Sequence, residues 1–144
     1  TMFGKGTLDP LMKRRSIYFQ IKRSKLIPTM QLFDSPEPLV GQGARTSTII
    51  SPQALMFMNN DQIRASAMSL AGKLETEANS QAVMVGYQTV IGRAPSLREK
   101  QAILAFITKQ EESYREVGRN DARKLALADF AQVLFGLNEF VYVN

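Results

Sequence analysis

The spacing of apolar residues after position 50 predicts a series of helices. Apolar residues recur there every three or four positions, and Ile63, Ala67, Leu70 and Leu74 form one such stripe. This is the period of an amphipathic helix. The same spacing predicts helices over about 81–91, 96–117 and 120–137, and a shorter helix that begins at Ser51 and Pro52. The pattern therefore favours a mainly α body of about five helices.

Residues that favour helix ends lie at the expected boundaries. Ser96 and Glu99 complete the S-x-x-E pattern of a capping box, so a helix should begin at Ser96. The other boundaries carry asparagines that suit helix starts and glycines that suit helix ends. These residues are Asn59 or Asn60, Asn120, Gly92 and Gly118. The sequence therefore predicts where these helices begin and end.

The last helix is expected to be the core of the body, because residues 125–137 are apolar on nearly every side. Asp129, Gln132 and Gly136 interrupt the apolar surface along one narrow stripe. A carboxylate on such a helix needs a partner, because burying an unpaired charge is costly. We therefore expect Asp129 to form a structural salt bridge with an arginine, and we favour this role over catalysis.

The first fifty residues differ from the rest in composition. Four of the six prolines lie there, and the stretch Ser16–Ile21 is rich in β-branched and aromatic residues. This stretch predicts a strand with Ile17, Phe19 and Ile21 on one face, which we expect to be buried in the core. Further short strands are expected at 46–50 and 139–143. We expect a proline-rich arm over 1–50 with short strands and a helical body over 51–144. Together they would form one domain, the C-terminal part of a longer protein.

The net charge of +5 comes from the arm, because residues 1–50 carry eight Lys or Arg and three Asp or Glu. A basic, aromatic segment can bind nucleic acid through phosphate contacts and base stacking. However, the charges of 12–28 flank the predicted strand and leave its centre uncharged. This arrangement favours a structural role for the basic residues. No apolar run is long enough to cross a membrane, so membrane insertion is not expected.

The chain contains no cysteine and no histidine. This excludes disulfides within the chain, zinc sites of the usual kind, covalent attachment of c-type haem and Ser–His or Cys–His catalysis. We expect no cofactor in this chain. Met56 and Met58 are expected to fill gaps in the core. The adjacent Glu111 and Glu112 are expected to lie on a solvated helix face, with Arg115 supporting Glu111.

Five stretches, taken in order, resemble a known family. They are RRSIYFQIKRS (14–24), LFDSPEP (32–38), TSTIISPQALMFMNN (46–60), IGRAPS (91–96) and LFGLNEFVYV (134–143). Their order and spacing are similar to the C-terminal domain of unknown function in the large cytochrome-c-associated proteins of Planctomycetes. The resemblance implies a longer, exported parent protein that carries its haem in an upstream segment. It also implies an extracytoplasmic location and upstream domains of the same parent as partners.

The resemblance places six polar residues in motifs, and we interpret them as a polar network between arm and body. They are Arg14, Arg15, Asp34, Arg45, Gln53 and Asn59. Within this network we expect Arg14 or Arg15 to pair with Asp34, because buried charges are usually paired.

Three functions stay open at this point. The first, which we favour, is a non-catalytic accessory or interaction domain. The second is a part of an extracytoplasmic enzyme or electron-transfer assembly, related to polysaccharide, with its site at a domain interface. The third is a nucleic-acid binder. The absence of histidine and cysteine weighs against a catalytic site built within this chain alone, and the charge distribution weighs against the third function.

Overall fold

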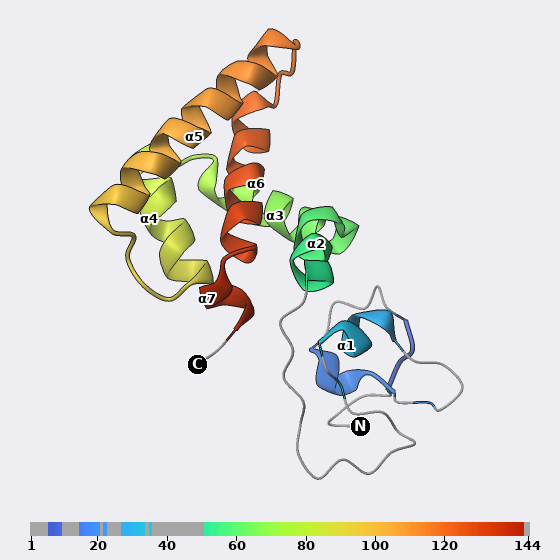
Figure 1. The fold of residues 1–144 in the computed structure, drawn as a ribbon. Helices are drawn as coiled ribbons and strands as arrows, with labels where there is room; N and C mark the ends of the chain where they lie inside the picture. Colours follow the sequence, from blue (N-terminus) through green and yellow to red (C-terminus); the bar gives the residue numbers. More distant parts are fainter. Residues whose placement is uncertain are drawn as a thin grey trace. The chain divides into compact units, whose positions relative to one another are not determined.

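The computed structural model describes residues 6–9, 15–20, 22, 27–33, 35 and 51–142, and this part of the chain is mainly helical (Figure 1). The predicted fold class is therefore confirmed. The chain forms two compact units, Thr1–Gln53 and Ala54–Asn144, which are described separately below. The described elements are η1 (Ser16–Tyr18), α1 (Pro28–Leu32), α2 (Ser51–Asn59), α3 (Asp61–Leu74), α4 (Asn79–Val90), α5 (Leu97–Glu116), α6 (Ala122–Phe135) and α7 (Asn138–Val141).

In the first unit, a 3-10 turn, η1, stands where a strand was predicted. Tyr18 N–H donates to the Arg15 carbonyl and Phe19 N–H to the Ser16 carbonyl, so these backbone groups bond locally. Thr7 forms an isolated parallel bridge with Phe19. A strand needs a partner along its length, and a single bridge does not supply one. Ile17 is accordingly exposed, so the prediction that it faces the core is wrong.

Helix α1 (Pro28–Leu32) begins at Pro28. Proline suits this position because the first helical residue has no backbone N–H bond to lose. Ile27, which precedes it, is buried. The predicted strand at 46–50 lies outside the described residues.

In the second unit, most helix ends follow the sequence signals. The Asn60 side chain accepts hydrogen bonds from the N–H groups of Gln62 and Ile63 and so caps α3. Gly92 and Gly118 have positive φ values beyond the ends of α4 and α5, a conformation that suits glycine. One cap was misplaced: α6 starts after Asp121, whose carboxylate pairs with Arg119 instead of capping the helix.

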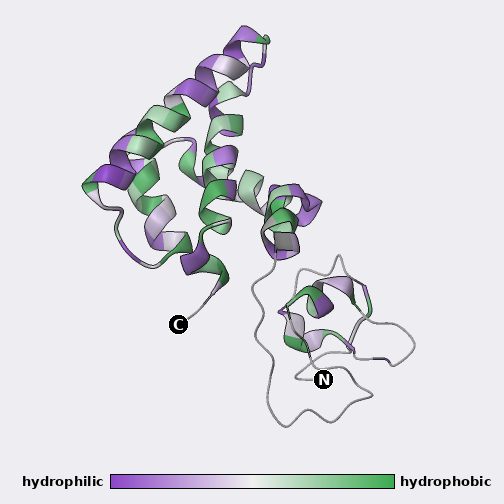
Figure 2. Ribbon diagram, viewed as in Figure 1, coloured by the Kyte–Doolittle hydropathy of each residue, from purple (hydrophilic) through white to green (hydrophobic). Residues whose placement is uncertain are grey.

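Helix α6 lies at the centre of this unit and packs against α3, α4 and α5 (Figure 1). Hydrophobic residues recur along it, whereas α5 also carries hydrophilic stretches (Figure 2). Phe130, Leu127 and Leu134 of α6 are fully buried, together with Val83 of α4 and Ile107 of α5. The prediction that this helix is the core is therefore confirmed. Val133 is an exception on the same helix and is exposed.

Gly86 allows α4 to approach α6 closely. A Cβ atom at this position would lie 2.7 Å from Phe130 Cε1 and 2.9 Å from Phe130 Cζ. Both distances are shorter than carbon–carbon contact allows, so a larger residue would displace the phenylalanine ring. The position thus fixes Phe130 against the α4 backbone.

Three further predictions are wrong. Residues 139–141 belong to helix α7, not to a strand. Met58 is exposed and does not fill the core, while Met56 is half-buried. Glu111 is buried because it lies one turn after Ile107 on the face of α5 that packs against α6; its carboxylate pairs with Arg115 as predicted. In the described part of the chain, none of the helices combines the length and hydrophobicity of a membrane span.

Candidate functional site

The loop between α4 and α5 positions Arg93 at the ends of three helices. Gly92, with a φ of 81°, lies just after the end of α4, and four residues later Ser96 caps the start of α5. Ser96 Oγ accepts a hydrogen bond from the Glu99 N–H, and the Glu99 carboxylate accepts one from the Ser96 N–H at 2.7 Å. The predicted capping box is therefore confirmed. It fixes the Glu99 carboxylate in front of the loop that carries Arg93.

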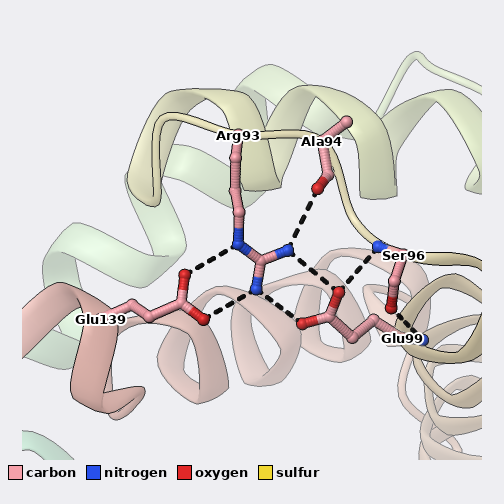
Figure 3. Close-up of polar contacts among 5 residues, drawn as sticks. All are labelled: Arg93, Ala94, Ser96, Glu99 and Glu139. Atoms are coloured by element: carbon pink, nitrogen blue, oxygen red, sulfur yellow. Dashed lines mark hydrogen bonds and ion pairs between the residues drawn. The ribbon is translucent and has the colours of Figure 1, made fainter.

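The Arg93 guanidinium binds two carboxylates, one from α5 and one from α7 (Figure 3). Nη2 and Nη1 donate to Glu99 at 2.7 and 3.0 Å. Nε and Nη2 donate to Glu139 at 2.8 Å each. Bidentate pairs of this kind are stronger and more directional than single contacts. We call Arg93, Glu99 and Glu139 the Arg93 clamp.

Every N–H group of Arg93 is engaged in the clamp. A guanidinium carries five N–H donors. Four meet the two glutamates, and the fifth, on Nη1, donates to the Ala94 carbonyl at 3.1 Å (Figure 3). The Arg93 Cζ atom also lies 5.5 Å from the centre of the Tyr87 ring, a cation–π distance. The clamp is therefore saturated, and Arg93 has no donor left for a phosphate or another anion.

The clamp shifts the pKa values of its members. Hydrogen bonds from Arg93 and Ser96 lower the pKa of Glu99 to about 2. The hydrogen bond from Arg93 lowers the pKa of Glu139, and the two carboxylates raise the pKa of Arg93. Burial, and then the charge of Glu99, raise the pKa of Tyr87. All members therefore keep their charge state near neutral pH, and none is suited to exchange a proton there.

A second polar cluster, the Asp129 network, links α6 to three other helices. Asp129 Oδ1 accepts from Arg64 of α3 at 2.7 Å, and Oδ2 accepts from the Tyr114 hydroxyl of α5 at 2.9 Å. Arg64 also donates to Gln132, whose Nε2 donates to the Met58 carbonyl at the end of α2. The expected salt bridge between Asp129 and an arginine is thereby confirmed. Hydrogen bonding and burial raise the pKa of Tyr114, with burial as the larger cause.

An apolar surface lies where α2, α6 and α7 meet. The Phe140 ring of α7 stands edge-on to Phe57 of α2, with 6.0 Å between ring centres. The same ring lies 5.2 Å from the Phe135 ring of α6. Four large apolar side chains are exposed on these three helices, and we call this set of side chains the α2–α7 surface. They are Leu55, Met58, Val133 and Phe140.

The structure describes three of the six residues of the predicted polar network. Arg15 is exposed and immediately precedes η1. Gln53 is buried, and its Nε2 donates to the Leu32 carbonyl at 2.9 Å within the first unit. Asn59 is exposed at the end of α2. Arg14, Asp34 and Arg45 lie outside the described residues, so the network and its ion pair with Asp34 stay predictions.

Sequence reasoning missed Arg93 and Glu139 as site residues. Both lie in stretches that carry the family resemblance, IGRAPS and LFGLNEFVYV, and this was the signal that could have found them. Their pairing joins residues 46 positions apart. Helical periodicity cannot reveal a contact between a loop and a distant short helix. Among the residues that the structure describes, no group of acidic side chains is arranged to hold a metal ion.

Comparison with protein families identifies a family for this chain. A family model described as PSD1, protein of unknown function (DUF1553), matches residues 5–107. The matched region includes Arg93, Ser96 and Glu99 and ends before Asp129 and Glu139. Neither the curated proteins nor the solved structures provide a match.

Proposed function

We propose that this chain, which belongs to the PSD1 family of proteins of unknown function (DUF1553), is a non-catalytic interaction domain of a larger protein. In this proposal the parent protein is exported and carries haem in an upstream segment, as the motif resemblance implies. The upstream domains of the same parent are the binding partners. The domain contributes a docking surface, and any chemistry takes place elsewhere in the parent.

The observation that carries this proposal is the α2–α7 surface. Leu55 and Met58 are three residues apart, so they share one face of α2. Gln132, the residue before Val133, bonds through its side chain to the Met58 carbonyl, so α6 contacts the end of α2 one residue away from the exposed Val133. Phe140 completes the group through its ring contacts with Phe57 and Phe135. Grouped exposed apolar side chains are typical of protein–protein contact sites.

The polar groups of the same body support a structural role. Arg93 uses all of its donors on the clamp, and both Asp129 oxygens accept hydrogen bonds from neighbouring helices. Arg123 of α6 donates to the Glu75 and Glu77 carbonyls and to the Asn79 side chain, and so holds the loop before α4. These contacts join the helices of the body to one another, so these polar groups have structural partners.

Binding between this chain and the upstream part of the parent tests the proposal. The two parts are expressed separately, and calorimetry measures their association. We expect a complex that Leu55→Asp weakens by at least about tenfold, because a buried contact leucine would carry a charge. Leu97→Asp is the matched control, since Leu97 is also exposed but lies at the start of α5. The absence of any complex would overturn the proposal, as would equal weakening by the two variants.

A further inference from the structure

Helix α7 is held by two contacts of different chemistry on adjacent residues. Glu139 forms a bidentate ion pair with Arg93 at 2.8 Å. Phe140, the next residue, places its ring against Phe57 and Phe135. The helix therefore occupies a surface that has a cationic part and an aromatic part side by side. An acidic residue followed by an aromatic residue satisfies both parts at once.

The contacts that hold α7 on the body are of a kind that can break while the rest of the body stays folded. The helix has four residues, and no side chain caps its start. The Glu139 side chain is 54% exposed, so its carboxylate regains water readily when it leaves Arg93. Arg93 then keeps its bidentate pair with Glu99, so no unpaired charge is left behind. Short elements held by exposed contacts open locally far more often than the whole fold unfolds.

We propose that α7 occupies a binding site for a segment of the partner protein and is displaced when that segment binds. Arg93, Phe57 and Phe135 form this site. The partner is a peptide segment that presents a carboxylate followed by an aromatic ring. This inference rests on the proposed function, because it adds to the α2–α7 surface the neighbouring site that α7 covers, where Phe57 and Phe135 contact Phe140. The guanidinium selects the carboxylate through two parallel hydrogen bonds, and the phenylalanine rings select the aromatic group.

Competition between α7 and the partner determines the measured affinity. A tethered segment has a high effective concentration at its own site, in the millimolar range for short connections. A free peptide of the same sequence should therefore bind the native chain weakly. It should bind much more tightly when α7 has lost its own carboxylate and ring. The affinity gained on weakening α7 shows that the α7 site accepts a segment supplied in trans, which the inference requires.

The probe is a fluorescent peptide with the sequence LNEFVY of residues 137–142. Its affinity is measured by fluorescence anisotropy for the full native chain and for the full chain with Glu139→Gln and Phe140→Ala. We expect binding to the double variant at least about tenfold tighter than binding to the native chain. The same peptide with Glu139→Gln should lose most of this gain. A chain with Glu112→Gln, an exposed glutamate of α5, is the control for charge removal and should behave as the native chain does.

Two measurements keep the test decisive if the double variant folds poorly. Circular dichroism checks its helix content, and NMR of the native chain with excess peptide reports whether the Phe140 signals move to those of a released helix. Displacement of Phe140 supports the inference. Peptide binding that is absent from both folded chains, or that is equal in both, overturns it.

The experiment separates this inference from the proposed function. If the upstream part of the parent binds the native chain and the double variant equally well, and the peptide binds neither, the α7 inference fails while the proposed function stands. If the peptide binds and the upstream part does not, the site is supported and the proposed partner is wrong.

Discussion

Arg64 and Arg93 each join helices of the same body through carboxylates, but they do so at different depths and in different parts of the fold. Arg64 reaches Asp129 in the middle of α6, and the Asp129 side chain is 20% exposed. Arg93 reaches Glu99 at the start of α5 and Glu139 in α7, and the Glu139 side chain is 54% exposed. The first pair lies against the core, and the second lies at helix ends.

This difference in exposure indicates what each cluster contributes to the stability and geometry of the fold. A partly buried carboxylate without its partners is costly, so the Asp129 network fixes how α3 and α5 sit on α6. Exposed ion pairs add little to the free energy of unfolding, so the Arg93 clamp mainly sets the positions of helix ends. The two clusters are connected through the core. Tyr87, beneath Arg93, stacks on Phe130 with 6.4 Å between ring centres, and Phe130 follows Asp129 in the chain.

The largest effect is expected from Phe130→Ala, which removes the connection between the two clusters. The ring is fully buried, so its loss should lower the free energy of unfolding by about 3–5 kcal/mol. Urea denaturation followed by circular dichroism measures the change. Gly86→Ala perturbs the same ring from the α4 side and should cost less, about 1–3 kcal/mol, through overpacking. A Phe130→Ala chain as stable as the native one would show that the ring does not support the core.

Asp129→Ala should have the next largest effect, a loss of about 2–3 kcal/mol in the free energy of unfolding. The change leaves Arg64 and the Tyr114 hydroxyl without their shared acceptor in a partly buried setting. Urea denaturation gives the value. Asp129→Asn is the matched variant, because it keeps an acceptor and loses the charge, and it should cost less. Equal stability of the native and Asp129→Ala chains would contradict the assignment of a structural role to this network.

Ser96→Ala should have a smaller effect, because it removes one half of the capping box at an exposed helix start. The Glu99 N–H loses its acceptor, and the expected cost is about 1 kcal/mol. Ser96→Asp restores an acceptor at the cap and should recover most of the loss. Hydrogen exchange of the first turn of α5 adds a local readout. If Ser96→Ala leaves both the stability and the exchange unchanged, the capping box has no energetic role.

The smallest effect should appear as a pH dependence of the Arg93 clamp. The folded pKa of Glu99 is about 2, below its ordinary value of 4.5, so the ionised form stabilises the fold. This stabilisation is complete above about pH 4.5 and disappears as the pH falls toward 2. Glu99→Gln keeps a capping residue and removes the charge. The stability difference between the native and Glu99→Gln chains should therefore shrink over this interval in urea titrations. A difference that is constant with pH would rule out the ion pair as its source.

Local features of the fold were predictable from the sequence, and distant pairings were not. The capping box at Ser96 depends on residues three positions apart, and the apolar stretch of α6 is visible in the chain itself. The sequence also indicated that Asp129 needs an arginine, but it did not identify Arg64, which lies 65 residues away. Glu111 was misjudged because its neighbour Glu112 suggested a solvated face. Its spacing of four from the buried Ile107 was the better guide.

The errors at the two ends of the chain have a common physical cause. The stretches 16–21 and 139–143 are rich in residues with high β propensity, and both were assigned to strands. A strand forms when a neighbour pairs with it, so propensity alone does not decide. Among the described residues near Ser16, Thr7 and Phe19 form an isolated bridge, and local 3-10 bonds prevail. At residues 138–141 the ion pair and ring contacts of α7 prevail. Glu139, one of the three residues of the Arg93 clamp, therefore lies in a segment whose structure depends on distant residues.

The central position of α6 has a consequence for how the protein is made. A ribosome delivers the chain from its N-terminal end at roughly 5–20 residues per second, so α3, α4 and α5 emerge before the helix they pack against. Their apolar faces, including Leu74, Val83 and Ile107, have no complete core until residues 122–135 have left the exit tunnel. The nascent body is therefore open to chaperones for several seconds, and its final collapse has to wait for the synthesis of α6.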